Sequence, residues 1–169
     1  MGGEDAVQDV ALTLGTRMSV LQPVVIGTLV AGTLDISAAI LTWLPRGVAP
    51  GRVLRSVAGG LLGRAAASGG AATAALGLFL HFAIMCAIVT VFVLASRRWP
   101  MLTPRALLPA VGCGVIYGIV VYLAMTYVVV PLSASPMRPP TVRQFLEGIA
   151  VHIACVGVPI VLIARAAAR

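Results

Sequence analysis

Four side chains that can handle protons or cations lie within long apolar stretches of this sequence. Asp35, His81 and His152 are ionisable, and Tyr122 carries a phenol. A charge at the centre of a bilayer costs roughly 2.5–3.5 kcal/mol on insertion scales, so such residues usually pair with one another or mark a functional path. The four could satisfy one another through hydrogen bonds, or they could pass a proton or a cation.

The depths of these residues match when they are counted along spans of alternating direction. With a rise of about 1.5 Å per residue, Asp35 lies about 0.6 of the way across from the N-terminal face. His81 and His152 reach about the same level, and Tyr122 falls within roughly one turn of it. A glycine precedes each histidine by one turn, and small residues mark packed helix faces. We therefore expect these four side chains to form a polar intramembrane cluster.

The two histidines add a further alternative, because two histidines at one depth in a helical bundle can hold a haem iron from both sides. Asp35, His81 and His152 are also acceptable metal ligands by type. Neither histidine, however, has an HxxxH or HxxxD partner in its own helix. We expect no metal site and no cofactor other than the haem alternative, for which His81 and His152 would be the ligands.

Other patterns predict no chemistry. The glycine-rich stretch GGLLGRAAASGG at 59–70 lacks the Gly-Lys-Ser/Thr ending of a phosphate-binding loop. Cys86, Cys113 and Cys155 each lie alone in an apolar run without a CxxC partner, as small hydrophobic residues do. We expect no catalytic residues and no enzymatic activity.

The composition predicts the elements that must position these residues. Of the 169 residues, 60% are apolar and 10% are charged, against roughly a quarter charged in a soluble domain. Lipid solvates apolar surface that water would not. We expect an all-α membrane protein in a single domain, a bundle of four transmembrane helices. The predicted spans cover about residues 22–44, 72–95, 106–130 and 144–164, with a kink at Pro159 in the last.

The stretch of about residues 52–66 is too short and too basic to span a bilayer. Arg52 and Arg55 fall on one side of a helical wheel. The opposite side carries mostly apolar residues, namely Val53, Leu54, Val57 and Leu61. This pattern predicts an interfacial helix between the first two spans, whose arginines reach lipid headgroups and whose apolar side, Leu61 included, faces inward.

The charged residues indicate a lipid environment rather than nucleic acid. All twelve basic residues are arginine and the net charge is +7, but the arginines are scattered through loops without interleaved aromatic residues. We expect the lipid bilayer as the main partner, a second copy or another membrane protein as a further one, and no nucleic acid. Near the last span, Glu147 follows Arg143 by four residues, which predicts an i,i+4 ion pair.

Three segments resemble small uncharacterised four-span proteins of the bacterial inner membrane. They are GTLVAGTLD at 27–35, GLFLHF at 77–82 and YGIVVYLAMTYVVVPLS at 117–133. The resemblance implies a multi-pass protein in the bacterial inner membrane with a compact bundle, and it supplies no catalytic residues. Arginine-only, alanine-rich usage is typical of GC-rich bacterial coding.

Four spans place both termini on one side of the membrane. The compact basic cluster at 97–105 favours the cytoplasmic side for that loop and for the termini. Reporter fusions at the two ends should therefore both report the cytoplasm. Opposite compartments for the two ends would exclude an even number of spans.

Overall fold

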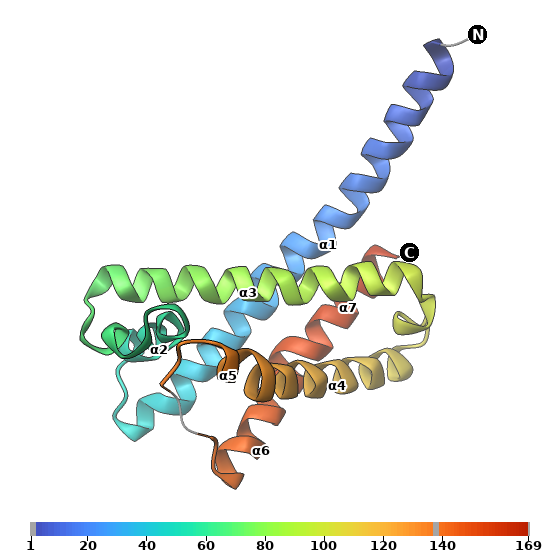
Figure 1. Ribbon diagram of the computed structural model, residues 1–169. Coiled ribbons are helices and arrows are strands. Elements are labelled where there is room, and N and C mark those ends of the chain that lie inside the picture. Colours follow the sequence, from blue (N-terminus) through green and yellow to red (C-terminus); the bar gives the residue numbers. More distant parts are fainter. Residues whose placement is uncertain (1–2, 137–138, 169) are drawn as a thin grey trace.

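The computed structural model describes residues 3–136 and 139–168, and all of its regular elements are helical (Figure 1). The α-helices are α1 Gly3–Trp43, α2 Pro50–Leu62, α3 Ala71–Arg98, α4 Leu107–Ala124, α5 Val130–Leu132, α6 Val142–Val151 and α7 Val158–Ala167. Short 3₁₀ turns follow α1, α2 and α3. The all-α prediction is confirmed for the described residues.

Four helical stretches are long and apolar enough to cross a membrane. They are Val20–Arg46, Ala71–Arg98, Leu107–Leu132 and Val142–Ala167. Many of their large apolar side chains are exposed, including Leu29 at 57% and Phe79 at 68%. Lipid, rather than water, suits such a surface. α1 begins well before the first expected span, and its N-terminal part projects away from the other helices (Figure 1).

Two of these stretches change to π-helix for about one turn. Met125–Val129 joins α4 to α5, and His152–Gly157 joins α6 to α7. Each π segment ends just before a proline, at Pro131 and Pro159 respectively. Proline has no N–H to give to the carbonyl one turn earlier and its ring crowds that carbonyl. The wider π turn accommodates this loss without breaking the helix.

The third and fourth spans meet at backbone distance. A Cβ atom on Gly118 would lie 2.6 Å from the carbonyl oxygen of His152. A Cβ atom on Gly114 would lie 2.6 Å from Cα of Val158. Only glycine allows this approach, as expected for a small-xxx-small face that packs against another helix in lipid.

Glycines also mark the other close contacts between helices. Gly77 of α3 lies directly against the backbone carbonyl of Leu54 in α2. On α1, Gly32 faces the ring of Phe82 from α3. The first span thereby packs on the second, and α2 packs on the start of the second span.

In α2, Val53 is buried and Arg52 is exposed as predicted, but Leu61 departs from its predicted orientation. Ala58 and Gly59 are buried, whereas Leu61 is 62% exposed, so the prediction that Leu61 faces inward is wrong. The 133–136 segment lies on α2 beside Gly59 and Gly60, and the Ala134 N–H donates to the Gly60 carbonyl at 2.9 Å. Small residues therefore take the inner positions and leave Leu61 outside.

Two glycines of α4 provide a matched test of the close contact. Gly118→Ala should destabilise the protein by about 1–3 kcal/mol, because the new methyl group overpacks against the His152 carbonyl. Gly112→Ala should be neutral or stabilising by up to about 1 kcal/mol, because nothing lies within 4 Å of that position and alanine favours helix. Unfolding in mixed detergent micelles measures both. Equal effects of the two substitutions would contradict the contact.

Candidate functional site

His81 links the first and second spans through a backbone carbonyl. The side chain is buried, and Nε2 lies 2.9 Å from the carbonyl oxygen of Gly32. Its ring also meets Phe82 edge-on, with 5.3 Å between the ring centroids. If Nε2 carries the proton, His81 donates to a carbonyl already inside a helix, which fixes α3 against α1.

His152 lies at the start of the π segment, beside the third span. Its Nδ1 lies 3.0 Å from the carbonyl oxygen of Gly148 in the preceding turn. The ring of Tyr122 meets the His152 ring edge-on at 5.2 Å between centroids. Tyr122 itself is buried and packs against Gly148. The structure thus brings together two of the four residues of the expected cluster, Tyr122 and His152.

Asp35 is half-buried on α1, one turn after Gly32. Across residues 20–136 and 139–168, its carboxylate has no hydrogen bond and no ion pair, and neither histidine comes within ion-pairing distance of it. The helix that carries Asp35, α1, packs both on α3 and on the π segment of the fourth span, which contains Cys155.

The polar groups occupy different helix contacts. His81 lies between the first two spans, and His152 and Tyr122 lie between the last two. The single four-residue cluster stays a prediction, while the direct bonds made by the two histidines run to backbone carbonyls. Thr28, two turns before Asp35, also has a buried hydroxyl without a partner among the described residues.

The two histidines lie at different helix contacts, which does not favour a haem held between them. Nε2 of His81 lies on a carbonyl of the first span, whereas His152 packs edge-on against Tyr122 of the third. Among the described residues, no group of three potential ligands forms a metal site.

An ion-pair network closes one end of the contact between the first and last spans. Arg46 donates to both carboxylate oxygens of Glu147 at 2.8 Å, and Arg143 Nε donates to the same group at 2.8 Å. The predicted Arg143–Glu147 pair is confirmed. Arg46 was not predicted, because it precedes Glu147 by 101 positions in the chain and leaves no local signal.

The chain matches no family model, no characterised protein and no solved structure closely enough to identify a relative. Among the ionisable groups in mid-span, Asp35 differs from the two histidines because its carboxylate has no hydrogen bond or ion pair among the described residues.

The bond from His81 to Gly32 predicts a measurable contribution to stability. His81→Leu should lower the free energy of unfolding by about 0.5–1.5 kcal/mol, because a hydrogen bond between spans is lost. Phe79→Leu, two residues earlier on an exposed part of the same helix, serves as the control and should change stability little. Chemical or detergent unfolding followed by circular dichroism measures both. A His81→Leu protein as stable as the control would contradict this role.

Proposed function

We propose that this chain is a multi-pass membrane protein that binds and passes protons or small cations through its polar interior, with Asp35 as the group that takes the charge. One observation carries the proposal. The carboxylate of Asp35 lies well inside the first candidate span and has no hydrogen bond or ion pair among the described residues. The other mid-span ionisable groups are already engaged with carbonyls.

The cost of this arrangement supports a functional role. A carboxylate at the centre of a span costs roughly 2.5–3.5 kcal/mol, and pairing normally offsets that cost. Asp35 can avoid it by taking up a proton or by binding a cation. Either event neutralises the carboxylate in the membrane interior, by protonation or by pairing with the cation. Such binding and release is the elementary step of proton or ion movement.

The packing of α1 on the last span supports movement toward that span. Cys155 and His152 lie on the π segment against which α1 packs, and Tyr122 contacts the ring of His152. Imidazole and phenol groups can relay a proton when water joins them. π turns are frequent at functional positions in membrane and soluble helices.

The proposal includes a location and an arrangement in the membrane. The four long helices would form a bundle in the bacterial inner membrane, with both termini in the cytoplasm. The helix α2 would lie at the interface opposite the two termini. There the exposed side chains of Arg52 in α2 and Arg64 in the following turn reach headgroups.

A second candidate is a structural or assembly protein without transport. The bonds from His81 and His152 to backbone carbonyls favour it, because such bonds fix helix register and need no moving charge. Asp35 would then pair with a polar group of a second copy or of another membrane protein.

Proteoliposomes separate the two candidates. A potassium gradient with valinomycin should drive acidification that an internal pH dye detects. Asp35→Asn should reduce that flux at least tenfold, because an amide neither binds nor releases a proton at neutral pH. Ser37→Ala, an exposed position on the same helix, should keep the wild-type rate.

The same variants show which candidate fails. Equal flux in wild type and Asp35→Asn, with or without sodium, would contradict proton or cation movement. If Asp35→Asn instead shifts the protein from oligomer to monomer in detergent, the assembly function is correct.

A further inference from the structure

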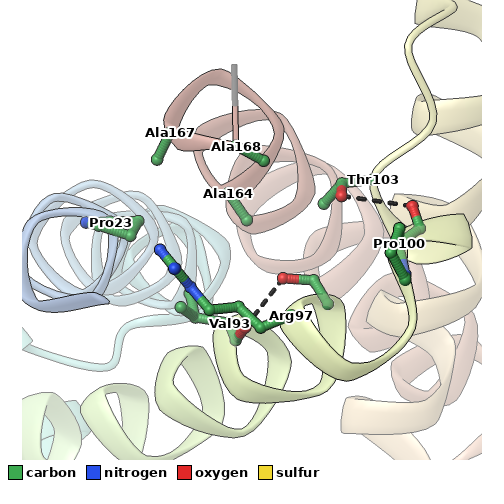
Figure 2. A pocket seen from close by; sticks show the side chains of 9 residues that line it. Pro23, Val93, Arg97, Pro100, Thr103, Ala164, Ala167 and Ala168 are labelled. Atoms are coloured by element: carbon green, nitrogen blue, oxygen red, sulfur yellow. Dashed lines mark hydrogen bonds between the residues drawn. The ribbon is translucent and has the colours of Figure 1, made fainter. Parts of the chain in front are cut away.

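A pocket of about 450 Å³ opens at the end of the molecule where α3 and α7 end (Figure 2). Its lining comes from α1, α3, the following turn and α7, and comprises Pro23, Val93, Ser96, Arg97, Pro100, Thr103, Ala164, Ala167 and Ala168. The walls are mostly alanine, valine and proline. Figure 2 shows Arg97 reaching from α3 toward Pro23 of α1, with the alanines of α7 on the other side.

This end of the described structure carries positive charge. Arg97, Arg98, Arg105 and Arg165 lie in the last turn of α3, the following loop and α7. The two acidic side chains from residue 20 onward are elsewhere, at Asp35 in mid-span and at Glu147 near the opposite end of the last span. The pocket therefore combines an arginine side chain with apolar walls.

The loop beside the pocket is held in place by Arg165. Its Nε donates to the carbonyl of Pro104 at 3.0 Å, and its other nitrogen donates to the carbonyl of Arg105 at 2.6 Å. These bonds hold the 100–105 segment against α7, so the wall of the pocket that carries Pro100 and Thr103 is fixed in place. Thr103 on that wall donates to the Pro100 carbonyl at the long distance of 3.5 Å, so its hydroxyl can turn to another acceptor.

We propose that this pocket binds the phosphate group of an anionic phospholipid. Arginine is suited to phosphate because its planar guanidinium presents several N–H donors to the oxygens. Arg97 would contact the phosphate, and Thr103 would donate a further hydrogen bond. The glycerol part would lie against Ala164, Ala167 and Pro23, and the volume is in the range of small-ligand sites.

The position of the pocket favours a lipid over free phosphate. It opens where candidate spans end, at the level expected for headgroups. Its apolar walls suit a glycerol and the start of acyl chains, whereas inorganic phosphate would meet a single arginine and mostly apolar surface. The proposal does not depend on Asp35, which does not line this pocket.

Lipid titration with native mass spectrometry tests the site on the full chain in detergent. Dioleoyl phosphatidylglycerol should bind at one saturable high-affinity site. Arg97→Gln should weaken that binding about fivefold, the effect of one arginine near an anionic headgroup. Arg52→Gln, an exposed arginine on α2 at the other end of the molecule, is the matched control and should bind as wild type does.

Two further measurements complete the test. Ala167→Leu keeps all charges but narrows the pocket, and it should weaken phosphatidylglycerol binding at least as much as Arg97→Gln does. Inorganic phosphate should not displace the bound lipid. Equal weakening by Arg52→Gln and Arg97→Gln, unchanged binding in both pocket variants, or full displacement by inorganic phosphate would overturn the proposal. Circular dichroism verifies that each variant is folded.

Discussion

The structure depends on backbone-to-backbone contact between the third and fourth spans. At Gly114 and Gly118 there is no space for a Cβ atom against Val158 and His152. In lipid, apolar side chains gain nothing from leaving the solvent, so helices associate through dispersion contacts and hydrogen bonds that require close approach. The same constraint recurs where Gly77 of α3 meets the backbone of α2. These backbone contacts set the positions of the helices, and the helices in turn set which partners the polar side chains can reach.

Close packing explains the partners of the histidines and the isolation of Asp35. With α3 close to α1, His81 reaches the Gly32 carbonyl, and with α4 close to the π segment, Tyr122 reaches the ring of His152. Backbone carbonyls thereby meet the hydrogen-bonding needs of both histidines. Asp35 needs a donor instead, and carbonyls cannot supply one. A packing arrangement that satisfies both histidines thus leaves the Asp35 carboxylate in mid-span without a partner among the described residues.

The sequence predicted those features that depend on local composition. Apolar runs predicted four helices able to cross a membrane, and the glycines one turn before His81 and His152 predicted packed faces, which Gly77 and Gly148 form. The pairing of Asp35 could not be predicted, because depth along a span says nothing about which neighbour a side chain faces. The π segments before Pro131 and Pro159 also shift the faces that a regular wheel assigns. Arg46 was missed because only the fold brings it to Glu147.

The central claim is that Asp35 changes its charge inside the membrane. Infrared difference spectroscopy of the protein in lipid, recorded across a pH titration, observes the protonated carboxyl group directly through its C=O stretch. The account predicts a carboxyl band that appears and disappears reversibly with pH, shifts in D₂O and is absent from Asp35→Asn. A spectrum in which the Asp35→Asn substitution removes no titrating carboxyl band would contradict it.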